Sequence, residues 1–185
     1  MANLILIHGT AGHSQENWFP WLKNELESLG HNVFAPDFPT PKDQTLQNWF
    51  NVFKDYEEYL NEDTVLIGHS LGPSFILRIL EKTNVKVKAC FFVAGFIGFL
   101  NNPEFDTLNK DFVINPFNWN KINANCEHFT LIIAEDDPYV PLQKGIDISK
   151  QLNASFHALK KGAHLNEAAG FTEFPFLLEL VKKEL

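Results

Sequence analysis

A short apolar run leads directly into a serine flanked by two glycines in the sequence TVLIGHSLGP, residues 64–73. The apolar run predicts a buried strand, and the helical spacing of apolar residues that begins near Leu71 predicts a helix directly after it. Such a sharp turn brings two backbones so close that only hydrogen fits at the flanking Cα positions, Gly68 and Gly72. We therefore expect Ser70 at the apex of the turn, with its hydroxyl exposed above the carboxyl end of the sheet.

The alternation of short strands with longer helical segments extends along the whole chain. Apolar residues between the strands recur with the period of a helix. This alternation is typical of βαβ units, so we expect an α/β fold: a three-layer sandwich with a mostly parallel sheet of about six strands and helices on both faces. The length of 185 residues suits one domain, 1–185. The predicted strands are Leu4–Ile7, Asn32–Ala35, Thr64–Ile67, Lys88–Val93, Phe129–Ala134 and Ser155–Leu159.

A serine hydroxyl is a weak nucleophile and needs a base, which in turn needs a group that fixes its tautomer. His164 follows the last predicted strand and should lie at the same sheet edge as Ser70, so it is the best-placed base. The other histidines lie inside, before or between strands, and His69 directly flanks the serine.

The orienting carboxylate is expected where the strand Phe129–Ala134 runs directly into three acids, Glu135 to Asp137. Prolines 138 and 141 fix the turn after Asp137, so we favour Asp137, with Asp136 as second choice. The alternative is that all three acids cap the helix predicted over Leu142–Leu152.

Two backbone amides are candidates for an oxyanion hole. The Leu71 amide lies at the start of a predicted helix, where the first N–H groups have no intrahelical acceptor. The Thr10 amide lies on the glycine-containing loop His8–His13, after the first strand. This loop lacks the GxGxxG and GxxxxGK[ST] patterns of nucleotide sites, and the chain has no HExxH pattern, so we expect no cofactor and no metal.

The segment Gly95–Ile122 interrupts the strand-helix rhythm, because it mixes aromatic residues with asparagine pairs and prolines. We interpret it as a long irregular connection. Such loops are often lids or binding loops, but its aromatic side chains could equally complete the core. We name Phe96 and Trp119 from this segment, together with His69, as candidate substrate-binding residues.

The charge and the lack of long apolar runs exclude several classes of protein. With 23 acidic and 15 basic side chains the net charge is -8, which opposes binding to nucleic acid or anionic lipid. No run approaches the roughly 18 apolar residues of a membrane span, and the longest apolar run at the N-terminus, Leu4–Ile7, is far shorter than the roughly 7 to 15 residues of a signal-peptide core. Cys90 and Cys126 are expected to be reduced thiols. We therefore expect a cytoplasmic protein with a small-molecule substrate, without nucleic acid or membrane; the sequence identifies no protein partner.

Together these residues resemble the α/β-hydrolase superfamily, in which the triad follows the chain order Ser, Asp, His. The short length and the Asp136-Asp137-Pro138 turn are similar to the small serine hydrolases related to retinoblastoma-binding protein nine. The resemblance implies a minimal hydrolase fold without a cap domain, and hydrolysis of small ester, amide or peptide substrates. The matching residues are His8-Gly9, Gly68-x-Ser70-x-Gly72, Asp137 in Asp-Pro-Tyr-Val-Pro, and His164.

The alternative function is a catalytically weak or inactive protein of the same fold that acts as a protein-binding module, because a fold alone does not define a function. A protein selected only for binding has no physical need for a serine, a histidine and an aspartate each at a strand end. The completeness of this set favours the enzyme.

Overall fold

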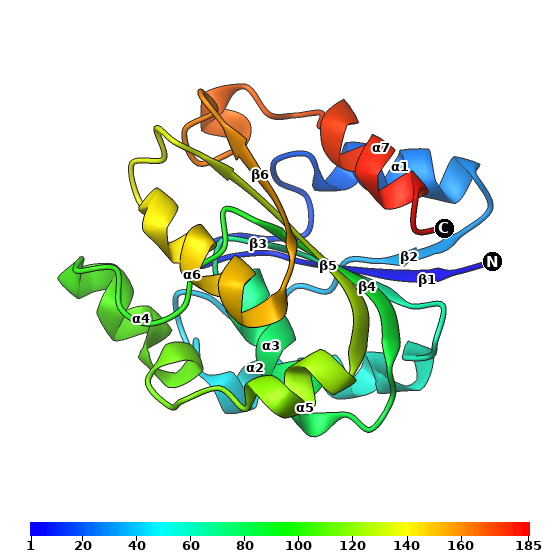
Figure 1. Ribbon diagram of the computed structural model, residues 1–185, viewed down its shortest axis with the longest axis horizontal. Coiled ribbons are helices and arrows are strands. Elements are labelled where there is room, and N and C mark those ends of the chain that lie inside the picture. Colours follow the sequence, from blue (N-terminus) through cyan, green and yellow to red (C-terminus); the bar gives the residue numbers. More distant parts are fainter.

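The computed structural model describes residues 1–185, and Figure 1 shows a twisted central sheet between layers of helices. Six strands form the sheet in the order β2-β1-β3-β4-β5-β6, and every neighbouring pair is parallel. The expected three-layer α/β fold is confirmed. The strands are β1 (Asn3–Ile7), β2 (Asn32–Phe34), β3 (Val65–His69), β4 (Val87–Val93), β5 (Cys126–Ala134) and β6 (Ser155–Leu159).

Helices cover both faces of the sheet. Helices α1 and α7 lie together on one face, and the remaining α-helices lie on the other (Figure 1). Two short 3-10 helices, η1 (Lys54–Tyr59) and η2 (Glu167–Ala169), complete the structure. The α-helices are α1 (Phe19–Ser28), α2 (Leu46–Phe53), α3 (Gly72–Lys82), α4 (Pro103–Val113), α5 (Trp119–Ala124), α6 (Leu142–Leu152) and α7 (Pro175–Lys182).

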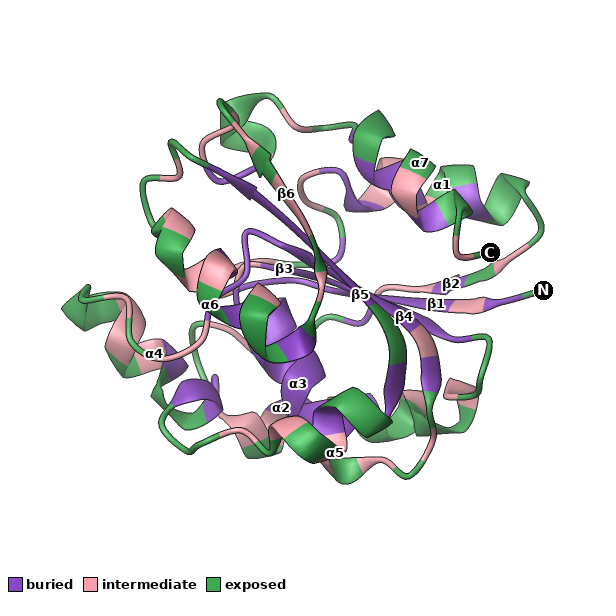
Figure 2. Cartoon of the chain, viewed as in Figure 1, coloured by how far each residue is buried: buried purple, intermediate pink, exposed green.

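The two faces of the sheet form two separate apolar cores, because successive side chains of a strand point to opposite faces. In β1, Leu4 and Leu6 pack under α1 and α7, whereas Ile5 and Ile7 belong to the core on the other side. The central strands are therefore buried on both faces, as Figure 2 shows. This explains why the strands are recognisable in the sequence as continuous apolar runs.

The thiols of Cys90 and Cys126 are free and buried, with 3.5 Å between the two Sγ atoms.

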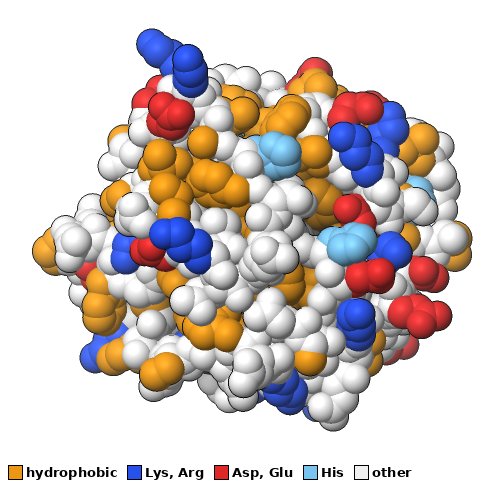
Figure 3. Space-filling model, viewed as in Figure 1, with side chains coloured by type: hydrophobic (Ala, Val, Ile, Leu, Met, Phe, Trp, Pro, Cys, Tyr) orange, Lys and Arg blue, Asp and Glu red, His pale blue; other side chains and the backbone are white.

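On the face shown in Figure 3, Lys and Arg side chains are scattered among acidic and polar ones. No helix combines the length and the apolar character that crossing a membrane requires.

The prediction of an irregular connection over Gly95–Ile122 is wrong, because the segment contains α4 and the start of α5. The Asn102 side chain caps α4 by accepting hydrogen bonds from the amides of Glu104 and Phe105, and Pro103 occupies the first turn. Asparagine followed by proline is a helix start as well as a loop signal. The aromatic residues of the segment divide between the core, where Phe112 is fully buried, and the surface.

Candidate active site

The turn between β3 and α3 holds Ser70 in a left-handed conformation, with a φ of 57°. This region is strained for a residue with a side chain. A Cβ at Gly68 would lie 2.7 Å from the Pro73 nitrogen, and one at Gly72 would lie 2.3 Å from the Ile7 carbonyl oxygen. The backbones approach as closely as the sequence predicted, and both glycines are needed for it.

His164 and Asp137 form a buried pair at the same edge of the sheet. The distance between His164 Nδ1 and Asp137 Oδ2 is 2.8 Å, and the Asp137 side chain has no exposed surface. The second oxygen, Oδ1, accepts hydrogen bonds from the amides of Tyr139 and Val140. Because a carboxylate can only accept, His164 Nδ1 donates, and Nε2 is left as a hydrogen-bond acceptor.

Asp136 contacts the loop that carries His164 and not its ring. Its Oδ1 accepts hydrogen bonds from the amides of Gly162 and Ala163, both at 2.9 Å. The alternative that the acids cap α6 is wrong, because Pro141 occupies the capping position and no side chain bonds to the helix start there. Asp136 therefore holds the loop, while Asp137 orients the ring.

Ser70 and His164 both line a cavity of about 210 Å³. No hydrogen bond joins their side chains, a looseness that is common in structures without substrate. The cavity is mostly apolar. Its other lining residues are Thr10, Ala11, Phe96, Leu100, Phe105, Asn109, Tyr139, Val140 and Asn166.

The amides of Thr10 and Leu71 donate no hydrogen bond within the protein. Thr10 lines the cavity beside Ser70, and Leu71 directly precedes α3, whose N-terminus carries partial positive charge. The Thr10 N–H group is thus unused on a residue that lines the cavity, whereas Leu71, next to Ser70, is buried and is not among the lining residues.

Of the three predicted substrate-binding residues, only Phe96 lines the cavity, so the expectation for His69 and Trp119 is corrected. The His69 side chain is buried behind His164, and its Nε2 donates to the His164 carbonyl oxygen at 2.9 Å. Burial lowers the pKa of His69 to about 3, so its ring is neutral. Trp119 begins α5 and packs against Phe117, with 5.3 Å between ring centroids.

The sequence analysis did not identify three polar residues of the cavity: Asn109, Tyr139 and Asn166. Tyr139 follows Asp137 by two positions, and its ring centroid lies 5.1 Å from that of His164. Asn166 follows His164 by two positions, so both residues could have been found as neighbours of the predicted site. Asn109 comes from α4 and has no such signal.

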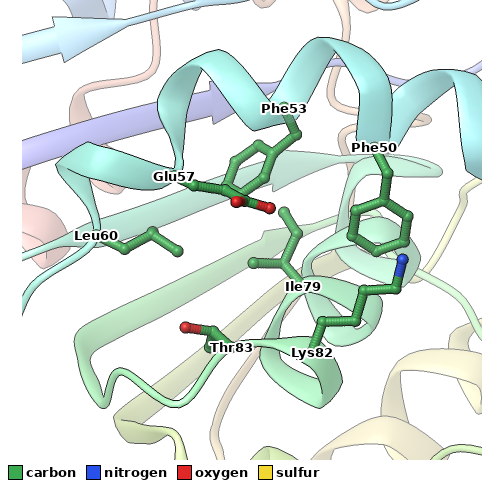
Figure 4. A pocket seen from close by; sticks show the side chains of 7 residues that line it. All are labelled: Phe50, Phe53, Glu57, Leu60, Ile79, Lys82 and Thr83. Carbon is green, nitrogen blue, oxygen red and sulfur yellow. The ribbon is translucent and has the colours of Figure 1, made fainter.

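A second cavity, of about 240 Å³, lies between α2, η1 and the end of α3 (Figure 4). Its lining includes no histidine, and the Lys82 ammonium group lies 3.4 Å from the centroid of the Phe50 ring. Thr83 provides the one hydroxyl group in the lining of this cavity, and this hydroxyl accepts a hydrogen bond from the Val85 amide. This cavity lacks a nucleophile with a base. Nowhere do three or more His, Cys, Asp or Glu side chains form a group that could hold a metal ion.

The parallel sheet and the serine on its strand-to-helix turn define the class of the protein as an α/β hydrolase. A family model described as serine hydrolase matches residues 4–183, so the chain belongs to the serine hydrolase family and is a hydrolase. The expected resemblance to the small serine hydrolases of the α/β-hydrolase superfamily is confirmed.

Relatives of the chain match it over nearly its whole length. The Bacillus subtilis protein YdeN is 32% identical over 180 residues, which cover 96% of this chain and 93% of YdeN. The serine hydrolase RBBP9 of Rattus norvegicus is 26% identical, over 98% of this chain and 94% of its own. The crystal structure of the ydeN gene product from B. subtilis superposes with a TM-score of 0.93 at 29% identity, covering 100% of this chain and 98% of that one.

Proposed function

We propose that Ser70, His164 and Asp137 form a catalytic triad with which the protein hydrolyses small esters or amides. The observation that carries this proposal is the His164–Asp137 pair, joined at 2.8 Å, beside a strained serine on the same cavity. Membership of the serine hydrolase family supports it.

In the first half of the reaction, Ser70 Oγ attacks the carbonyl carbon of the substrate while its proton passes to His164 Nε2. The imidazolium formed in this step donates its Nδ1–H to Asp137 Oδ2, and the negative charge of Asp137 stabilises it. The carbonyl oxygen becomes an oxyanion, which accepts hydrogen bonds from the amides of Thr10 and Leu71. Loss of one such donor typically raises the barrier by about 2.7 to 4 kcal/mol, so these amides matter nearly as much as the side chains.

Collapse of this intermediate breaks the bond to the leaving group, which takes the proton from His164 Nε2 and departs as an alcohol or amine. Ser70 is then acylated. In the second half, His164 accepts a proton from water as the water attacks the acyl carbon. Collapse of this second intermediate breaks the bond between the acyl carbon and Ser70 Oγ, and His164 Nε2 gives its proton to that oxygen. The products are a free acid and the regenerated Ser70 hydroxyl.

The size and character of the cavity favour a short acyl group. Its volume is about 210 Å³, and Phe96, Leu100 and Phe105 provide apolar walls. Polar groups at fixed points of an apolar cavity are typical of sites for small ligands. We therefore propose esters or amides of short acids as the substrate class, and not long-chain lipids.

A series of p-nitrophenyl esters of increasing acyl length tests the proposal. We expect the highest kcat/KM at two to four acyl carbons and background rates for Ser70→Ala. Ser28→Ala is the matched control, because Ser28 is an exposed serine of α1 whose hydroxyl bonds only to a backbone carbonyl. If the folded wild type hydrolyses none of the esters, or if Ser70→Ala retains full activity, the proposed function is wrong.

A further inference from the structure

Three polar residues that line the cavity have no part in the reaction described above, Asn109, Tyr139 and Asn166, and of these only Asn109 is buried. Asn109 is only 2% exposed, and its Oδ1 accepts hydrogen bonds from Thr10 Oγ1 and from Gln44 Nε2, the latter at 2.9 Å. Its Nδ2 has no hydrogen-bond partner in the protein. Every side-chain nitrogen or oxygen that is sealed inside the protein does have a partner. The Nδ2 group is therefore open to the cavity that Asn109 lines.

The orientation of this amide is fixed by neighbours that leave no choice of donor and acceptor. Gln44 Nε2 donates to the Leu108 carbonyl oxygen at 3.0 Å, and a carbonyl can only accept. The Gln44 amide is thus fixed, so the Asn109 atom that faces Gln44 Nε2 must be the acceptor Oδ1. On the other side, Thr40 Oγ1 donates to Gln44 Oε1.

The same network ties Asn109 to the predicted oxyanion loop. Thr40 Oγ1 accepts a hydrogen bond from the Ala11 amide at 2.7 Å, and the Thr10 hydroxyl donates to Asn109 itself. These hydrogen bonds thus connect the loop after β1, through Gln44, to α4. They fix the orientation of the Asn109 amide, on a residue that lines the same cavity as Ser70.

We propose that Asn109 determines substrate specificity by donating a hydrogen bond to an acceptor oxygen in the acyl part of the substrate. This inference rests on the proposed function. Phe96, Leu100 and Phe105 provide apolar walls, so an alkyl chain packed against them leaves this buried donor unpaired, which is unfavourable. A site that hydrogen-bonds a polar group of the substrate discriminates against analogues that lack this group. The substrate class becomes esters or amides of short acids that carry an ether, keto or similar acceptor oxygen.

Two esters of nearly equal size test this inference: p-nitrophenyl methoxyacetate and p-nitrophenyl butyrate, which differ by an oxygen in place of a methylene group. The measured quantity is the ratio of their kcat/KM values, methoxyacetate over butyrate. For wild type we expect this ratio to exceed the ratio for hydroxide-catalysed hydrolysis of the same esters by about fivefold, the effect of one neutral hydrogen bond.

Two variants remove the donor in different ways. Asn109→Ala deletes the side chain, and Asn109→Asp keeps the shape and both acceptor contacts but has no N–H group. We expect both to lower the ratio at least about fivefold. Lys110→Ala, which changes the next, exposed residue of α4, keeps the wild-type ratio. A merely structural defect would slow both esters alike and leave the ratio unchanged.

The outcomes separate this inference from the proposed function. If Ser70-dependent turnover is present but the wild-type ratio equals the hydroxide ratio, or the folded variants keep the wild-type ratio, the role of Asn109 is wrong and the triad stands. If wild type hydrolyses neither ester, the proposed function fails, and the inference fails with it. The wild-type ratio decides the question even if both variants fail to fold.

Discussion

Exchange of the two neighbouring aspartates for asparagine has opposite consequences for catalysis. In Asp137→Asn the amide oxygen takes the side that accepts from the backbone amides of Tyr139 and Val140. The amide nitrogen then takes the place of Asp137 Oδ2, which in wild type lies 2.8 Å from His164 Nδ1. Because this nitrogen can only donate, His164 must accept at Nδ1 and carry its proton on Nε2. Nε2 can then no longer take the proton of Ser70.

The expected loss follows from this change of tautomer. An equivalent substitution in a Ser-His-Asp triad lowers kcat by about 10⁴, or about 5.5 kcal/mol of barrier. In Asp136→Asn the oxygen that accepts from Gly162 and Ala163 can stay in place, and only the charge is lost. We expect that variant to keep kcat within about tenfold of wild type and to lose about 2 kcal/mol of unfolding free energy, because hydrogen bonds to charged groups are stronger.

Steady-state hydrolysis of p-nitrophenyl acetate by wild type, Asp137→Asn and Asp136→Asn measures these effects, and urea unfolding of each protein shows whether it is folded. Folded variants with equal losses of kcat would refute the assignment of roles. A larger loss in Asp136→Asn would transfer the orienting role to Asp136.

Two further predictions concern stability. Gly72→Ala lowers the unfolding free energy by at least about 2 kcal/mol, because its Cβ would lie 2.3 Å from the backbone oxygen of Ile7. Gly12→Ala is the control in urea unfolding, because its Cβ would meet the flexible end of the Glu16 side chain and lie 3.1 Å, not 2.3 Å, from the nearest backbone oxygen, that of Gly9; equal losses would contradict the prediction. Acid destabilises the fold through His69, since burial lowers its folded-state pKa to about 3 from an ordinary value of 6.5. Between pH 6.5 and pH 3 mainly the unfolded chain binds a proton at His69. As the pH falls below 6.5, the free energy of unfolding therefore decreases by about 1.4 kcal/mol per pH unit, or about 2 kcal/mol by pH 5. His69→Gln removes this contribution, so the unfolding free energy of the variant should change less between pH 7 and pH 5 than that of wild type. An equal change in the two proteins would contradict this role of His69.

The fold and the position of the site could be predicted because both depend on local signals. A parallel sheet buried on both faces leaves continuous apolar runs, as in β3, where all five residues are buried. The edge strand β6 also begins and ends at the predicted residues. The carboxyl ends of parallel strands share one edge, so Ser70, Asp137 and His164 were expected there together. The prolines after Asp137 fix its turn, which distinguished it from Asp136.

Other features depend on contacts between distant parts of the chain. Asn109 bonds to Gln44 and to Thr10, which lie 65 and 99 positions away in the sequence, and no spacing encodes these contacts. The start of α4 was missed because asparagine and proline serve both loops and helix starts. His69 is next to Ser70 in the sequence and is a candidate for substrate binding, but the end of β3 places its side chain in the core.

Labelling with a fluorophosphonate probe, followed by intact-mass and peptide mass spectrometry, tests most directly whether Ser70 is an activated nucleophile. We predict one probe molecule per wild-type chain, attached to Ser70, no labelling of Ser70→Ala, and labelling of His164→Ala slowed by orders of magnitude. A folded wild type that stays unlabelled, or that is labelled at another residue, would contradict the triad and favour a protein-binding module of the same fold.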